Sequence, residues 1–174
     1  MSGRILVCYA TRYGSTAEIA QVIGEELAQS GFLVDVVNIL NIEDIGQYYA
    51  VVIGSPLYMG KWLVEARDFV QQFKHPLSQR TVSVFTVGYS LKDLIRENIQ
   101  SAEEALDTIR LSISPSNAAF FAGMVDPDTM SAQDRAITRM GGVQAGDFRD
   151  WGMIREWART LAEQLRSLDA QAEK

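Results

Sequence analysis

Residues 5–16 read Ile5-Leu6-Val7-Cys8-Tyr9-Ala10 and then Thr11-Arg12-Tyr13-Gly14-Ser15-Thr16. The first six residues form a continuous apolar run, which is typical of a strand covered on both faces of a sheet. From Thr16 onward, apolar residues recur at helical spacing and stop before Gly31, which predicts an amphipathic helix. The beginning of the chain is therefore predicted to form a buried strand, a short polar loop and a helix.

The same alternation continues along the chain. Further strands are predicted at 32–37, 50–54, 81–87 and 118–122, and further helices at 62–73, 92–113 and 151–168. The third strand is expected to end abruptly at Ser55-Pro56, and the helix after it at the Lys74-His75-Pro76 break. One irregular region, Asp126 to Asp150, contains a helix-like stretch from Ser131 to Met140.

Strands that alternate with helices need crossover connections, which make neighbouring strands parallel and place helices over the sheet. The pattern therefore predicts an α/β fold, a doubly wound five-stranded parallel sheet with helices on both faces. The chain of 174 residues contains no internal repeat and no Gly/Ser-rich linker, so residues 1–174 are expected to form a single domain.

Composition excludes several classes of function. A net charge of -6 repels phosphodiester backbones, so nucleic acid is not an expected partner. The single cysteine, Cys8, fits a reducing compartment and predicts a cytoplasmic protein. The apolar run near the N-terminus is too short for a membrane span, which leaves only peripheral membrane contact open. His75 is the only histidine, and no His/Cys/acid grouping has metal-ligand spacing, so neither a catalytic triad nor a metal site is expected.

The loop after the first strand is the first candidate site, because open α/β sheets bind ligands outside the carboxyl ends of their strands. It carries hydroxyls at Thr11, Ser15 and Thr16, with Gly14 just before the predicted helix. Free amides at a helix start favour a phosphate group, and a glycine allows close approach. The alternative is an ordinary helix cap, for which Ser and Thr are also favoured. The position after the first buried strand favours phosphate binding.

Two further loops at the same edge carry aromatic side chains that suit a planar ligand. The loop after the third strand supplies Pro56, Leu57, Tyr58, Met59, Gly60, Lys61 and Trp62, and the loop after the fourth supplies Thr86, Val87, Gly88, Tyr89, Ser90 and Asp93. Leu57 and Trp62 have an alternative role as the first core residues of the next helix. A phosphate loop and two such loops together match flavin mononucleotide (FMN) along its length.

At these residues the sequence resembles the flavodoxin superfamily, whose hydroxyl-rich phosphate loop corresponds to Thr11, Gly14 and Thr16. Flavodoxins bind FMN where the winding direction of the sheet switches, and the resemblance implies the same cofactor and the strand order 2-1-3-4-5. It further implies that Arg12, Tyr13 and Ser15 lie with those three residues around the phosphate. The segments 56–62 and 86–93 would then flank the flavin ring.

Within that superfamily the sequence is most similar to the menaquinone-dependent protoporphyrinogen dehydrogenase family, which acts in haem biosynthesis. The similarity rests on Ala10-Thr11-Arg12, Ile53-Gly54 through Gly60, Ala122-Gly123, Gly141-Gly142 and Asp150-Trp151. It implies a quinone or a porphyrinogen as the redox substrate. The sequence departs from the family at Met124 to Gly146, which is shorter and carries Asp126, Asp128 and Asp134.

Two functions fit these features. The first is an FMN-dependent oxidoreductase, in which the flavin carries the redox chemistry, no side chain acts as a nucleophile, and Tyr58, Trp62 and Tyr89 shape the substrate face. The second is a flavodoxin-type electron carrier that docks onto a redox partner protein through acidic charge. Residues 126–150 favour the first, because a bare carrier does not require a flap near the flavin. A phosphorelay receiver is disfavoured, because Ala10-Thr11 and Ser55-Pro56 replace the acids that it requires.

Overall fold

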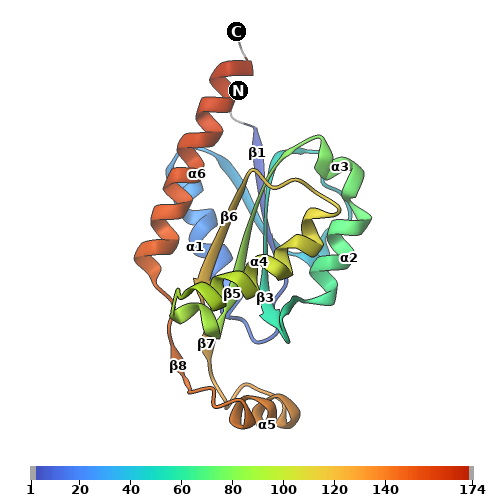
Figure 1. Ribbon diagram of the computed structural model, residues 1–174. Coiled ribbons are helices and arrows are strands. Elements are labelled where there is room, and N and C mark those ends of the chain that lie inside the picture. The colour runs from blue at the N-terminus through green and yellow to red at the C-terminus, as the bar shows by residue number, and fades with distance from the viewer. Residues whose placement is uncertain (1–2, 173–174) are drawn as a thin grey trace.

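The computed structural model describes residues 3–172, so residues 1–2 and 173–174 of the expected domain lie outside the described residues (Figure 1). Five parallel strands lie in the order β2-β1-β3-β5-β6, which confirms the predicted α/β fold and its 2-1-3-4-5 winding. The strands are β1 (Arg4–Tyr9), β2 (Leu33–Asn38), β3 (Tyr48–Tyr58), β5 (Thr81–Gly88) and β6 (Asn117–Ala122). A short β4 (Lys61–Trp62) pairs antiparallel with the end of β3.

Helices cover both faces of this sheet, as expected. One face carries α1 (Ser15–Gln29) and α6 (Trp151–Ala172), and the other carries α2 (Val64–Gln72), α3 (Lys74–Ser78) and α4 (Arg96–Arg110) (Figure 1). Two short 3-10 helices, η1 (Ile39–Asn41) and η2 (Tyr89–Lys92), follow β2 and β5. Beyond the carboxyl ends of the strands lies α5 (Ala132–Met140), at the end of a ribbon formed by β7 (Met124–Val125) and β8 (Gly146–Asp147). None of the helices within residues 3–172 is long and apolar enough to cross a membrane.

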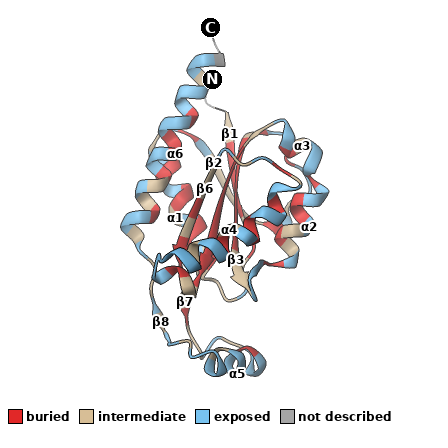
Figure 2. Cartoon of the chain, viewed as in Figure 1, coloured by how far each residue is buried: buried red, intermediate tan, exposed pale blue. Residues whose placement is uncertain are grey.

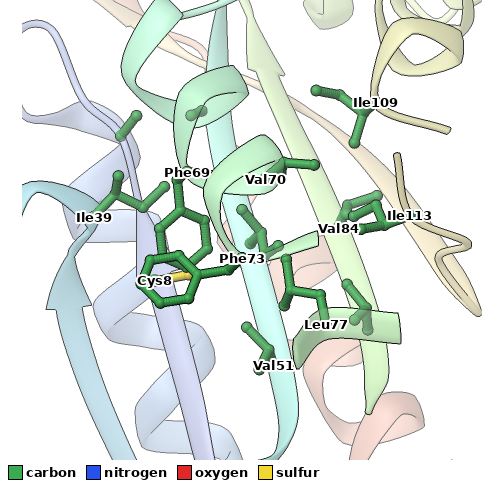
Figure 3. Close-up of a cluster of buried hydrophobic side chains, with 14 of the residues drawn as sticks. Cys8, Ile39, Val51, Phe69, Val70, Phe73, Leu77, Val84, Ile109 and Ile113 are labelled. Atoms are coloured by element: carbon green, nitrogen blue, oxygen red, sulfur yellow. The ribbon is translucent and has the colours of Figure 1, made fainter. Parts of the chain in front are cut away.

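The sheet separates two apolar cores because successive side chains of a strand point to opposite faces. Ile5 and Val7 of β1 pack towards α1 and α6, whereas Leu6 and Cys8 pack towards α2, α3 and α4. Figure 2 shows the central strands as buried and the outer faces of the helices as exposed. Cys8 lies in the core beneath α2, near the rings of Phe69 and Phe73 (Figure 3), and burial raises the pKa of its thiol.

Strand β3 differs from the sequence prediction, because it continues through Ser55-Pro56 to Tyr58. The predicted abrupt end at Ser55-Pro56 is wrong. Beyond Gly54, β3 still pairs with β5 through Pro56 and Val87, but β1 has already ended at Tyr9. A proline is tolerated there because one side of the strand is an open edge.

The helix after β3 begins later than predicted but ends within one residue of its predicted end. The chain first turns back through Met59 and Gly60, which both have positive φ, as in a two-residue hairpin. Trp62 therefore lies in β4, and α2 begins only at Val64. At the other end α2 stops at Gln72, just before Lys74-His75-Pro76, as predicted. These three residues then begin a separate short helix, α3, in which Pro76 falls in the first turn and needs no amide partner. The helix expected at 92–113 is likewise shorter, because η2 and an extended link precede α4.

Candidate functional site

The loops after β1, β3 and β5 border one cavity of about 190 Å³ at the carboxyl edge of the sheet. These are the three loops that the sequence singled out. The predicted residues that line the cavity are Thr11, Arg12, Tyr13, Ser15, Thr16, Pro56, Leu57, Tyr58, Val87, Gly88 and Tyr89. Most of the predicted site is therefore brought together at the expected end of the fold.

The first loop has the geometry of an anion-binding turn. Gly14 has φ +96°, a conformation that favours glycine, and a Cβ added there would meet no atom within 4 Å. The amide of Gly14 donates to Thr11 Oγ1 over 2.9 Å. Within the described residues no side chain caps the N-terminus of α1. The first-turn amides of α1 are therefore oriented to receive an anion.

Trp62 and Thr86 do not line the cavity, which corrects their prediction as residues beside a flavin ring. Trp62 is 1% exposed and Thr86 is 0% exposed. The indole Nε1 of Trp62 donates to Thr86 Oγ1 over 2.9 Å. Trp62 therefore takes its alternative role as a core residue. The hairpin turns its ring into the core, where it contacts Thr86 of β5.

Other predicted residues of these loops also lie outside the lining. Met59 and Gly60 form the exposed hairpin turn, with Lys61 exposed beside them. Asp93 is exposed and pairs with Lys92 over 3.0 Å. Ser90 belongs to η2, where its carbonyl accepts a hydrogen bond from Asn98. These residues shape or flank the rim of the site, and Gly14 shapes the loop without lining the cavity.

The remaining wall of the cavity comes from Gly123 and from residues 124–147, which we call the arm. It consists of β7, α5, β8 and the turns between them, and the helix-like stretch predicted at 131–140 is confirmed as α5. Ser131 caps this helix by accepting a hydrogen bond from the Asp134 amide over 3.1 Å. The arm residues that line the cavity are Met124, Val125, Met130, Asp134, Ile137, Thr138 and Val143.

Asp134 joins the arm to the first two loops. Its carboxylate accepts hydrogen bonds from Arg12 Nε over 2.7 Å and from the Tyr58 hydroxyl over 2.7 Å, and the Tyr13 hydroxyl also donates to it. The Arg12 guanidinium lies 4.1 Å from the centre of the Tyr58 ring, which adds a cation–π contact. Asp134 is only 4% exposed. A buried carboxylate is therefore held by three donors from two different loops.

This network also shifts proton affinities. The hydrogen bond from Arg12 holds the pKa of Asp134 well below its usual range, and the tyrosine donors act in the same direction. The same contact raises the pKa of Arg12, and the hydrogen bond to Asp134 raises the pKa of Tyr58. At neutral pH the cluster therefore holds an ionised Asp134 beside a protonated Arg12.

We expect this ion pair to persist during moderate acidification. A carboxyl whose pKa is lower in the folded protein stabilises the fold above its unfolded pKa of about 3.9, and this contribution is lost only as the pH falls through the lower folded pKa. The ¹³Cγ resonance of Asp134 should therefore stay at its ionised position in an NMR titration from pH 7 down to about pH 3, where an unperturbed aspartate is mostly protonated. A midpoint at or above the unfolded value of about 3.9 would contradict the described network.

The third loop also contacts the arm. The Tyr89 hydroxyl accepts a hydrogen bond from the Gln144 amide over 3.3 Å, and the Tyr89 ring packs edge-on against Phe148 at 5.4 Å. At the base of the arm Arg149 pairs with Asp147 over 2.7 Å and also with Glu18 of α1. All three loops of the site are thus tied to the arm or its base.

Sequence reasoning expected residues 126–150 to form a flap near the flavin but named none of the arm residues as part of the site. The spacing of Ser131 and Asp134 marks a helix start, and no pattern links Asp134 to Arg12, which lies 122 positions away. The one signal in the sequence was the irregular region itself, which stands between the last strand and the last helix.

A parallel sheet in the order β2-β1-β3-β5-β6, with a glycine and hydroxyl loop between β1 and α1, defines the flavodoxin-like class of proteins. The sequence also matches the family model described as "Flavodoxin domain" over residues 6–149. The chain therefore belongs to the flavodoxin-domain family. This membership implies a flavin cofactor and a redox protein.

Known proteins agree with this assignment. Protoporphyrinogen IX dehydrogenase [quinone] of Escherichia coli strain K12 is 25% identical over 171 residues, which cover 91% of this chain and 94% of that protein. Among solved structures, a flavodoxin of Streptococcus pneumoniae TIGR4 is similar with a TM-score of 0.62 at 16% identity, covering 94% of this chain and 98% of that one. A flavodoxin from the domain Archaea has a TM-score of 0.59 at 15% identity, covering 94% and 99%. The two structural similarities establish the fold.

Proposed function

We propose that the cofactor is FMN and that the protein is an FMN-dependent oxidoreductase acting on a small organic redox substrate. The observation that carries this proposal is the arm, which closes a walled cavity over the edge where the flavin-binding loops meet. The proposal places the protein in a reducing cytoplasm, which the single buried cysteine supports.

The first loop fits the phosphate of FMN. The hydroxyls of Thr11, Ser15 and Thr16 and the uncapped amides of α1 would hold the anion. Arg12 is already paired with Asp134, so its positive charge is not free to neutralise the phosphate. In this arrangement the helix dipole of α1 and the hydrogen bonds of the loop would stabilise the phosphate charge. Riboflavin, which lacks the phosphate, would lose these contacts.

The second and third loops fit the ring. Leu57, Tyr58, Gly88 and Tyr89 border the cavity and offer apolar and aromatic surface for a planar ligand. When bound, FMN supplies transfer of hydride or of single electrons at its ring. In this proposal the side chains of the two loops bind and orient the flavin ring and exclude water from it. None of them acts as a nucleophile.

The substrate is proposed to be a quinone or a porphyrinogen. This part of the proposal is supported by the E. coli relative, which is named for both substrates. With the arm docked, the cavity of about 190 Å³ is well below the roughly 300–1,000 Å³ of most small-molecule sites. A tetrapyrrole would therefore react only at a site with the arm displaced.

A flavodoxin-type carrier is the second candidate. It is favoured by the fold of the flavodoxin neighbours and by the net charge of -6, which suits docking to a basic redox protein. In that case the partner is a protein and the arm has no substrate to enclose.

One experiment separates these functions. The visible spectrum of the purified protein, or of protein reconstituted with FMN, is expected to show bound flavin. Anaerobic reduction is then followed with NADH, NADPH, protoporphyrinogen IX and a menaquinol analogue. Reduction by one of these small molecules is the expected result. Flavin that is reduced only by a protein reductase would favour the carrier, and a protein that cannot be loaded with FMN would contradict both functions.

A further inference from the structure

We propose that the arm is a lid over the flavin site and that Asp134 is the positioning residue that holds the lid closed. The identity of the ligand under the lid rests on the proposed function. The hydrogen bonds of the Asp134 carboxylate, which we call the latch, are present in the structure whatever the ligand is.

The arm stands apart from both cores of the domain. It leaves the sheet through a ribbon of two residue pairs, Met124 with Asp147 and Val125 with Gly146. Figure 1 shows α5 beyond the carboxyl ends of the strands, and Figure 2 shows this helix as largely exposed. The arm can therefore change position without disturbing either apolar core.

Apolar burial does not hold α5 in place. Asp134 is the buried residue of this helix, whereas Ile137 is 41% exposed and Met140 is 88% exposed. A helix of nine residues is marginal in water on its own. The docked position of α5 therefore depends on hydrogen bonds. The Asp134 carboxylate accepts from Arg12, Tyr13 and Tyr58, and longer hydrogen bonds of 3.3 and 3.4 Å join Ser131 to the Tyr13 hydroxyl.

The position of the arm also favours movement. The docked arm forms one wall of the cavity of about 190 Å³, so a ligand in that cavity enters or leaves past the arm. The return path of the arm contains Gly142 at φ +69° and Gly146 at φ +153°, positions where the chain bends through glycine. Opening at this end would break the Asp134 contacts and expose the first two loops together.

The latch thus links the lid to the residues that would hold the cofactor. Arg12 and Tyr13 belong to the phosphate loop, and Tyr58 belongs to the loop beside the ring. Closing the arm orders both loops around the ligand, and releasing Asp134 frees both of them. The lid is therefore expected to control how fast the flavin enters and leaves.

The test compares Asp134→Asn with Asp128→Asn. Both variants remove one negative charge from the arm, but Asp128 is exposed and its carboxylate has no hydrogen bond to the three loops among the described residues. The first readout uses protein without flavin. Trypsin cleavage after Arg135 and Arg139, which are exposed on α5, is followed by mass spectrometry together with hydrogen exchange of residues 126–146. The second readout is the rate of FMN release into excess apoflavodoxin.

Asp134→Asn is expected to speed cleavage of the arm about tenfold, because loss of charge-assisted hydrogen bonds raises the open population. FMN release should rise by a similar factor, and circular dichroism should show that the unliganded protein remains folded. Asp128→Asn should behave as the wild type. Tyr58→Phe, which removes one donor and keeps the ring, should have a smaller effect in the same direction.

Equal cleavage of Asp134→Asn and Asp128→Asn would overturn the latch. Faster cleavage with unchanged FMN release would overturn the lid, because the arm would then move without affecting the ligand. Failure of the wild type to bind FMN would contradict the proposed function, and the cleavage result would still decide whether Asp134 holds the arm.

Discussion

The double variant Gly14→Val/Thr16→Ala is expected to weaken FMN binding by about 100-fold or more and riboflavin binding much less. Valine at φ +96° is strained by roughly 1–2 kcal/mol, so the loop should leave the conformation that presents the amides of α1. Thr16, which is 1% exposed, contributes a hydroxyl beside those amides. Lost hydrogen bonds to a charged group add about 1.5–3 kcal/mol, and about 2.7 kcal/mol corresponds to 100-fold.

Gly31→Val is the matched control for this variant. Gly31 also has φ +96° and also has open space at its Cβ position, but it follows the opposite end of α1. It should lower the free energy of unfolding in a similar way and leave both dissociation constants nearly unchanged. Isothermal titration with FMN and riboflavin measures the difference. Equal losses for the two ligands in the double variant would contradict the phosphate assignment.

Gly54→Ala is expected to destabilise the fold by about 3 kcal/mol, because overpacking a core typically costs 1–3 kcal/mol and this contact is severe. Gly54 pairs with Phe85 on the neighbouring strand. A Cβ at Gly54 would lie 2.0 Å from Phe85 Cζ, and Phe85 is fully buried against Trp157 and Phe121. These neighbouring rings restrict how far the Phe85 ring can move away.

Phe85→Leu should relieve this clash, because leucine lacks the far end of the ring. The double variant Gly54→Ala/Phe85→Leu should therefore be more stable than the sum of the two single effects, by about 1 kcal/mol or more. Gly152→Ala adds the same methyl group at an exposed position of α6 and should be neutral or slightly stabilising. Urea unfolding measures each free energy. Additive effects at positions 54 and 85 would show that Phe85 does not confine Gly54.

Local pattern was sufficient for the fold because its main signals act over short distances. The apolar run of β1, the hydroxyls and glycine of residues 11–16, and the spacing of α1 predicted strand, loop and helix in their observed places. Alternation of strands and helices then left few topologies, since crossovers between parallel strands have one hand. The strand order in turn predicted which edge of the sheet carries the three loops.

Tertiary structure decided what local pattern left open. Whether β3 ended at Pro56 depended on where β1 ended beside it, and whether Trp62 faced a ligand or the core depended on a hairpin and on Thr86. Sequence determined the glycine and hydroxyl loop at residues 11–16, because that loop is built from consecutive residues at one helix start. Only the folded chain could place Asp134 on Arg12, Tyr13 and Tyr58, because hydrogen bonds between distant segments have no periodicity for a sequence to display.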